Sequence, residues 1–98
     1  MNIGAAIKTL RKQKELGQKD LAEMCGVSVN ALSLIETNVT FPQKSTIEKI
    51  SKALGIPVSY LLLFSITDED VPEDKKAVFE LLNTAIKSVL VDTIKPQS

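Results

Sequence analysis

Asn30 and Ser33 have side chains that can hydrogen bond to the edge of a nucleic-acid base, and they lie about one helical turn apart. An Asn amide donates and accepts at the same time, so it can form a paired contact with adenine, whereas a Ser hydroxyl makes a single bond with several bases. The neighbouring Val29 and Leu34 can pack on a thymine methyl group. These side chains can therefore read base edges, provided that the chain presents them together on one surface.

Two short helices, residues 18–25 and 28–36, are predicted around these side chains, because apolar residues recur at helical spacing in both segments. The apolar positions are Leu21, Ala22 and Cys25 in the first segment, and Leu32 and Ile35 in the second. Gly26 can adopt the positive φ that a sharp turn requires, and the Ser28 hydroxyl can cap the second helix. Two helices joined by such a turn form a unit whose second helix enters the major groove of DNA.

A larger set of residues resembles the XRE, or Cro/C1-type, helix-turn-helix family of phage repressors and bacterial regulators in order and spacing. The set comprises Arg11, Gln18, Leu21, Ala22, Gly26, Ser28, Leu32, Ile35, Glu36, Pro42, Ile47, Ile50 and the run Leu54-Gly55-Ile56. The resemblance extends over about residues 3–63 and depends on the combination, since no single residue is specific. It implies an all-α fold with a five-helix, lambda-repressor-like DNA-binding domain.

The resemblance also implies a role for individual positions. Base-reading positions would be Val29, Asn30, Ser33 and Leu34; phosphate contacts would come from Gln18, Lys19, Asn38, Thr40 and Lys44; a structural ion pair would join Arg11 and Glu36. Four of these residues have a structural alternative: Val29 and Leu34 could pack on neighbouring helices, and Lys19 and Lys44 could be solvated surface residues. The reading helix contains no Arg, which puts more weight on DNA shape than on base contacts.

Along the whole chain, periodicity predicts six helices and no strand. They are residues 3–15, 18–25, 28–36, 45–54, 57–63 and 73–95. Ser45 and Glu48 have the spacing of a capping box at the start of the fourth helix, and Gly55 ends that helix. The segment 65–72, which contains the acidic run Asp68-Glu69-Asp70, is predicted to link a DNA-binding domain, residues 1–64, to a C-terminal helix, residues 73–95.

The C-terminal helix has a wide apolar stripe that needs a partner. Its residues are Val78, Phe79, Leu82, Ala85, Ile86, Val89 and Leu90. The stripe could fold back on its own domain, pair with the same helix of a second chain, or divide between the two. Pairing is favoured, because a five-helix unit of this type closes its own core and palindromic operators bind twofold dimers.

Charge and composition limit the remaining function classes. The net charge is zero, but residues 1–55 have eight Lys or Arg and five acidic residues, whereas residues 56–98 have four and seven. A basic head with an acidic tail suits a protein that binds DNA. The chain has no His and one Cys, and it has no phosphate-binding loop or paired carboxylates, so we expect no enzyme, metal site or cofactor.

The absence of a long apolar run predicts no membrane segment, and the single Cys suggests the cytoplasm. No small-molecule ligand is evident. The sequence thus favours a transcriptional regulator, in particular a repressor that binds a palindromic double-stranded DNA operator as a homodimer. The alternative is an antitoxin-like or adaptor module whose C-terminal helix binds a different protein.

Overall fold

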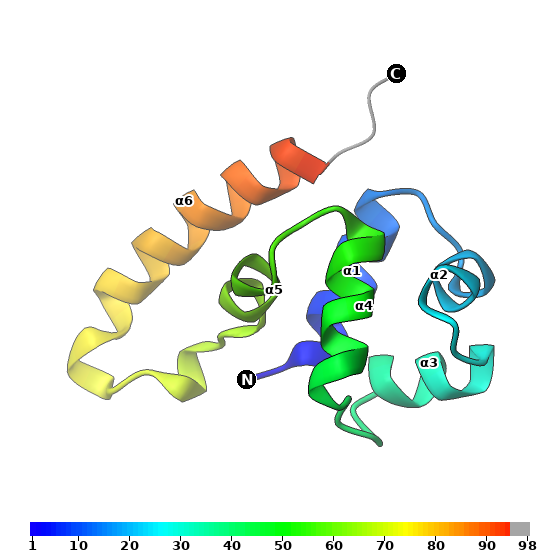
Figure 1. Cartoon of the computed structure of the whole chain (residues 1–98). Helices are drawn as coiled ribbons and strands as arrows, with labels where there is room; N and C mark the ends of the chain where they lie inside the picture. The colour runs from blue at the N-terminus through cyan, green and yellow to red at the C-terminus, as the bar shows by residue number, and fades with distance from the viewer. Residues whose placement is uncertain (95–98) are drawn as a thin grey trace.

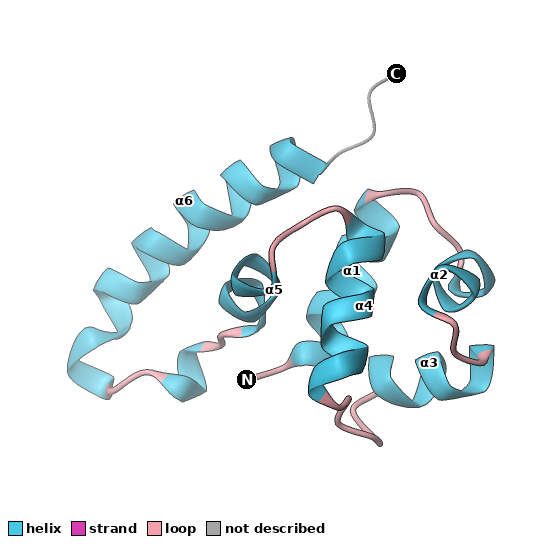
Figure 2. Ribbon diagram, in the orientation of Figure 1, coloured by secondary structure: helices cyan, strands magenta, loops and turns pink. Residues whose placement is uncertain are grey.

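The chain is entirely helical in the computed structural model, which describes residues 1–94; the side chains of residues 89–94 and all of residues 95–98 lie outside the description. The α-helices are α1 (Ile3–Gln13), α2 (Gln18–Cys25), α3 (Val29–Glu36), α4 (Lys44–Leu54), α5 (Val58–Ser65) and α6 (Lys76–Ile94). Two short 3₁₀ turns, η1 (Asp68–Asp70) and η2 (Glu73–Lys75), precede α6. The described residues contain no strand, so the all-α expectation is confirmed (Figure 2).

Helices α1 to α5 surround one apolar core. We refer to α1 to α5, residues 3–65, as the head. Helix α1 packs against α3 and α5, and α4 packs against α2, so that α1 and α4 lie at the centre of the head (Figure 1). The largest fully buried apolar side chains are Ile3, Ile7, Leu10, Leu21, Leu32, Ile50, Leu54 and Leu61. Each such side chain contributes about 1.5 to 3 kcal/mol by leaving water, so this shared core fixes how α2 and α3 sit on α1 and α4.

Residues in the left-handed backbone conformation lie at or just after the ends of four helices. Gly26 and Gly55 have φ of +69° and +72°, as expected for the residues that end α2 and α4, and Asn38 has φ of +61°. The end predicted for the first helix was wrong: α1 ends at Gln13, and Glu15 adopts φ of +59°. Gly17 has an ordinary φ of −76° because it is the N-cap of α2, where its backbone N–H donates to the Asp20 carboxylate.

The predicted capping box at Ser45 is also wrong. Helix α4 begins one residue earlier, at Lys44, and its N-cap Gln43 makes no side-chain capping bond. The Ile47 N–H already bonds to the Gln43 carbonyl at 2.9 Å, which places Ser45 inside the first turn. Pro42, two residues before this start, is buried, so the position of the boundary accompanies the burial of this proline and does not follow the local Ser–Glu spacing.

The acidic segment before α6 is held against the head. The Met1 amino group donates to the Asp70 carboxylate at 2.6 Å, and the Asn2 N–H bonds to the Ser65 carbonyl at 2.8 Å. The bond from the Met1 amino group lowers the pKa of Asp70 below its usual value, and a bond from the Thr67 N–H adds to this effect. The segment predicted as a plain linker therefore contains η1, and α6 begins at Lys76 instead of residue 73.

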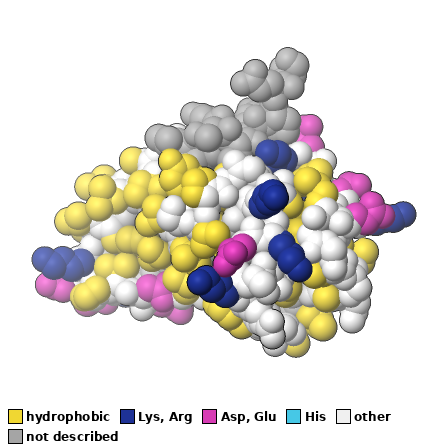
Figure 3. Space-filling view, in the orientation of Figure 1, with side chains coloured by type: hydrophobic (Ala, Val, Ile, Leu, Met, Phe, Trp, Pro, Cys, Tyr) yellow, Lys and Arg dark blue, Asp and Glu magenta, His cyan; other side chains and the backbone are white. Residues whose placement is uncertain are grey.

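Helix α6 turns two different faces to its surroundings. Ile86 packs against the core, Phe79 is half-buried, and the Lys87 ammonium lies 5.0 Å from the centre of the Phe64 ring. On the opposite side Val78, Leu81, Leu82 and Ala85 are exposed, and we refer to these four residues as the α6 stripe. Figure 3 shows hydrophobic side chains gathered over α6 and α5, and Lys side chains over α4.

Of the seven residues predicted for a dimer interface, the five whose side chains are described are divided between the two faces. Phe79 and Ile86 face the head, whereas Val78, Leu82 and Ala85 belong to the α6 stripe. Leu81 was not among the residues predicted for the interface, but it belongs to the α6 stripe and its side chain is 75% exposed. The side chains of Val89 and Leu90 lie outside the described residues. One edge of the helix thus packs on its own head, and the pairing of the other edge with a second chain stays a prediction.

Ser51 gives a prediction about the core itself. Its side chain is 2% exposed and its hydroxyl has no hydrogen-bond partner among the described residues, whereas the equally buried Ser65 hydroxyl donates to the Leu61 carbonyl at 2.7 Å. A buried polar group without a partner is costly, so Ser51→Ala should stabilise the fold by up to about 1 kcal/mol, and Ser65→Ala should destabilise it by about as much. Urea unfolding of both variants measures the two effects; destabilisation by Ser51→Ala would show that its hydroxyl has a partner.

Candidate nucleic-acid interface

The start of α3 is presented to solvent by the turn before it. Gly26 ends α2 in the left-handed conformation, and the Ser28 hydroxyl accepts from the Ala31 N–H at 3.0 Å, which is the predicted cap. Behind this surface Leu32 and Ile35 are buried, so α3 cannot rotate without exposing them. The geometry is that of the predicted helix-turn-helix unit, with the first turn of α3 directed outward (Figure 1).

The four predicted base-reading residues are not equally accessible. Val29 is 43% exposed and Asn30 is exposed, whereas Ser33 and Leu34 are half-buried. The Leu34 carbonyl accepts from the backbone N–H groups of Val39 and Thr40, which folds the following loop back on the end of α3. Partial burial supports a packing role for Leu34 beside any contact with DNA.

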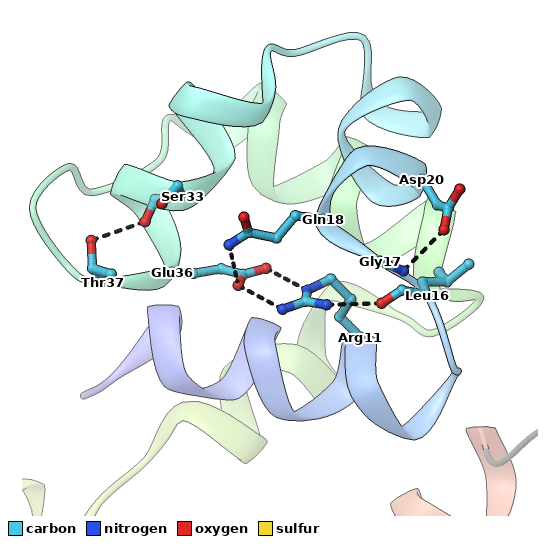
Figure 4. Close-up of polar contacts among 8 residues, drawn as sticks. All are labelled: Arg11, Leu16, Gly17, Gln18, Asp20, Ser33, Glu36 and Thr37. Carbon is cyan, nitrogen blue, oxygen red and sulfur yellow. Dashed lines mark hydrogen bonds and ion pairs between the residues drawn. The ribbon is translucent and has the colours of Figure 1, made fainter.

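A buried ion pair joins the end of α3 to α1. Arg11 Nε donates to Glu36 Oε2 at 2.8 Å, and a second guanidinium nitrogen donates to Glu36 Oε1 at 3.1 Å (Figure 4). A third bond, from Arg11 to the Leu16 carbonyl at 2.8 Å, ties the pair to the segment before α2. The side chains are 8% and 1% exposed, so both charges depend on this partnership. This is the pair that the resemblance implies.

The same carboxylate also holds Gln18, the first residue of α2. Gln18 Nε2 donates to Glu36 Oε1 at 3.1 Å, so Glu36 connects α1, α2 and α3 (Figure 4). The Gln18 side chain is half-buried and keeps one amide N–H and its carbonyl free of Glu36. The network therefore fixes the orientation of a side chain that the resemblance assigns to phosphate.

The other predicted phosphate residues lie in two exposed places. Lys19 is exposed in the first turn of α2, while Thr40 and Lys44 are exposed after α3. Lys44 is the first residue of α4, whose N-cap Gln43 makes no side-chain bond, so the amides of the first turn are open to an anion.

Asn38 has a different setting from the other predicted phosphate residues. Its Oδ1 accepts from the Gly4 N–H at 3.1 Å, and its Nδ2 donates to Asn2 Oδ1 at 2.6 Å. Asn2 in turn caps α1 by accepting from the Ala5 N–H. Both ends of the Asn38 amide therefore fasten the end of α3 to the start of α1, a structural role that nothing in the local sequence revealed.

Cys25 lies in the core at 3% exposure, where burial raises the pKa of its thiol although nearby Lys49 opposes the shift. Across residues 1–88, three or more His, Cys, Asp or Glu side chains do not gather into a possible metal site. Among the described helices, none has both the length and the apolar character needed to cross a membrane.

Comparison with known proteins agrees with this geometry. A family model described as helix-turn-helix matches residues 7–61. The chain is 40% identical over 70 residues, 70% of its length, to an uncharacterised HTH-type transcriptional regulator of Mycobacterium bovis. It is 40% identical over 62 residues, 63% of its length, to the immunity repressor protein of Bacillus phage phi105, and 43% identical over 61 residues, 61% of its length, to the HTH-type transcriptional regulator SinR of Bacillus subtilis.

The matched segments amount to 27%, 43% and 55% of those three proteins. The chain thus spans about half or less of the length of these relatives, and the residues that the family model matches lie in α1 to α5. Because the family model covers more than half of the chain and its matched residues include the hinge at Gly26 and the Arg11–Glu36 pair, the chain belongs to the XRE, or Cro/C1-type, helix-turn-helix family.

Proposed function

We propose that the protein is a transcriptional regulator, acting as a repressor, that binds a palindromic double-stranded DNA operator as a homodimer. The observation that carries the proposal is the exposed first turn of α3, with Val29 and Asn30 accessible and Leu32 buried behind them. Such a turn enters the major groove in proteins with this unit. The relatives named as a repressor and as transcriptional regulators support the regulatory part of this proposal.

Asn30 is the proposed base reader. Its exposed amide can donate and accept in one contact with adenine. Asn30→Ala should therefore weaken binding to the preferred operator by about 1 to 3 kcal/mol and relax the preference at one base pair, while affinity for random DNA changes little. Lys19→Ala is the matched control, because loss of a phosphate contact should weaken all sequences alike. Fluorescence titration of both variants on operator and random duplexes tests the role, and an equal loss on both DNAs for Asn30→Ala would refute it.

Phosphate contacts would set the register of the head on DNA. The candidates lie on both sides of α3: Gln18 and Lys19 at the start of α2, and Thr40 and Lys44 between α3 and α4. The proposal keeps Asn38 in this group through the second hydrogen of its Nδ2, since its Oδ1, its other Nδ2 hydrogen and its backbone N–H are already bonded. Contacts of this kind fix position and carry no sequence information themselves.

The α6 stripe is the proposed dimer interface. Val78, Leu81, Leu82 and Ala85 form a row at helical spacing that is open to solvent, and the other face of α6 packs on the head through Ile86. Two copies joined in this way would hold two reading helices at a fixed spacing.

A single substitution in this stripe should separate the copies. Leu82→Ser removes a leucine that is 55% exposed in one chain and that the dimer would bury twice, so dissociation should become about a hundredfold easier. Thr84→Ser, a change on an exposed side of the same helix, should leave the dimer intact. Light scattering over a dilution series measures the dissociation constant of the dimer. If Leu82→Ser has the same dissociation constant as the unmodified chain, the dimer interface lies elsewhere.

The second candidate function uses the same stripe for a different protein, as in an antitoxin-like or adaptor module. The observation that favours it is the size of the exposed residues, since Leu81 is 75% exposed. If the purified chain is monomeric and Leu82→Ser alters nothing, the stripe serves a different partner and the head alone accounts for DNA binding.

A further inference from the structure

The start of α1 and the end of α3 meet through a pair of side-chain amides, those of Asn2 and Asn38. Asn38 Nδ2 donates to Asn2 Oδ1 at 2.6 Å. Each amide oxygen also accepts from a backbone N–H of α1: Asn38 Oδ1 from Gly4 at 3.1 Å, and Asn2 Oδ1 from Ala5 at 2.9 Å. Because a backbone N–H can only donate, these two bonds fix which end of each amide is the oxygen and which is the nitrogen.

The amide pair leaves N–H donors without a bond. Asn38 Nδ2 keeps the second of its hydrogens, and Asn2 Nδ2 makes no bond to an acceptor within residues 1–88. Both side chains line one hollow of about 540 Å³, together with Thr40, whose hydroxyl is a further donor. Asn38 and Thr40 are exposed and Asn2 is half-buried. A set of oriented donors on an open surface is complementary to a DNA phosphate, whose free oxygens only accept.

Two carboxylates on η1, those of Asp68 and Glu69, line the same hollow. Their charges repel an anion, so a phosphate that binds there depends on donors that are already held in position. The carboxylates do not by themselves make a cation site, because three or more His, Cys, Asp or Glu side chains do not gather anywhere in residues 1–88. Their charge distinguishes the two kinds of occupant, since a phosphate would be repelled and a cation attracted.

We propose that Asn2 is a DNA-phosphate contact, and that the amides of Asn2 and Asn38 hold one phosphate diester in this hollow. The inference rests on the proposed function, because it requires the end of α3 to lie against a DNA backbone. Asn2 Oδ1 caps α1, and Asn2 Nδ2 donates to the phosphate. The contact comes from the start of α1, whereas the other proposed phosphate residues lie at the start of α2 and after α3.

Asn2→Ser separates the two tasks of this side chain. A Ser hydroxyl can still cap α1 by accepting from the Ala5 N–H, so the melting temperature should change little. The Nδ2 donors are lost, so the affinities for operator and for random duplex should fall alike, by about three- to tenfold. Asn83→Ser is the matched control, because Asn83 is also half-buried and lies outside the hollow, and it should leave both affinities unchanged.

The salt dependence of binding distinguishes a direct contact from a structural role. A neutral amide releases no counterion, so the slope of log affinity against log salt concentration should be the same in Asn2→Ser and in the unmodified chain. A changed slope would show that the head has shifted and lost contacts of its Lys side chains, which would overturn the direct contact. A loss confined to the operator would overturn it as well, because a phosphate contact carries no sequence information.

Glu69→Gln tests which kind of ion the hollow takes. Removing this negative charge should raise the affinity for random duplex by about twofold at low salt, and the gain should disappear at high salt, where charges are screened. Asp74→Asn is the matched control, because Asp74 is an exposed acidic residue outside the hollow, and its effect should be smaller. An unchanged or lower affinity in Glu69→Gln would overturn a phosphate in the hollow.

The two duplexes separate this inference from the proposed function. If Asn2→Ser binds random duplex as tightly as the unmodified chain does, the phosphate contact is overturned and the proposed function is unaffected. If the unmodified chain does not distinguish its operator from random duplex, the proposed function fails. A loss of affinity for random duplex in Asn2→Ser would still support the contact in that case, because a phosphate is present in every sequence.

Discussion

Arg11→Ala is expected to lower the free energy of unfolding by about 3 to 5 kcal/mol, because it leaves the Glu36 carboxylate buried without its cation. Glu36 is 5% exposed and would keep only the bond from Gln18 Nε2. The Leu16 carbonyl would lose its bond from Arg11 as well. The substitution should weaken the packing of three helices, since Glu36 joins α1, α2 and α3 (Figure 4).

Thermal unfolding followed by circular dichroism measures this effect. In a chain of this size a loss of 3 to 5 kcal/mol lowers the melting temperature by roughly 15 °C or more. Lys12→Ala is the matched control: Lys12 is the next residue along α1, its side chain is exposed, and its removal should change the melting temperature little. An Arg11→Ala protein with an unchanged melting temperature and weaker DNA binding would instead make Arg11 a phosphate ligand.

Gly4→Ala should be the next most damaging substitution, at about 3 kcal/mol, the upper end of the usual range for overpacking. A Cβ on Gly4 would lie 2.8 Å from the Glu36 carbonyl oxygen, 2.7 Å from Asn38 Oδ1, and closer still to the Ile35 carbonyl oxygen. Two of these neighbours are backbone atoms of α3, so α1 and α3 would have to separate. The Gly4 N–H would then also lose its bond to Asn38.

Urea unfolding of Gly4→Ala and of Gly17→Ala compares a crowded glycine with an open one. At Gly17 an added Cβ would meet only the Asp20 carboxylate, at 3.3 Å, and the cost should stay below that at Gly4. Equal stability of Gly4→Ala and the unmodified chain would mean that α1 can move away from α3 without loss. The close approach of these helices would then not be needed to set the end of the reading helix.

Local patterns in the sequence were enough to predict the hinge and the core. Gly26 and Ser28 adopt the conformations expected from their residue types, because a left-handed turn and an N-cap are decided within a few residues. The apolar spacing of α2 and α3 likewise identified Leu21 and Leu32 as buried. These features depend on residues that are close together in the chain, so the spacing of residue types in the sequence is enough to predict them.

Features that depend on distant contacts were missed or wrong. In the sequence Gly4 is indistinguishable from an ordinary helical residue, and only the structure shows that α3 packs directly on it. Asn38 likewise looks like a turn residue, and only the structure shows that its amide bonds to Gly4 and Asn2. The start of α4 at Lys44 and the left-handed Glu15 also depend on how the helices are connected in space. Leu81 was missed because a sequence pattern shows that a helix has an apolar side, but not how wide the exposed part is.

The central claim is that the exposed first turn of α3 reads DNA sequence in a twofold complex. Selecting bound duplexes from a random DNA pool with the purified chain tests it most directly. We expect an enriched inverted repeat, whose half-sites have centres about 10 base pairs or a multiple apart, and in Asn30→Ala a loss of preference at one position of each half-site. A pool that shows no enriched sequence, or an enriched sequence that Asn30→Ala leaves unchanged, would contradict it.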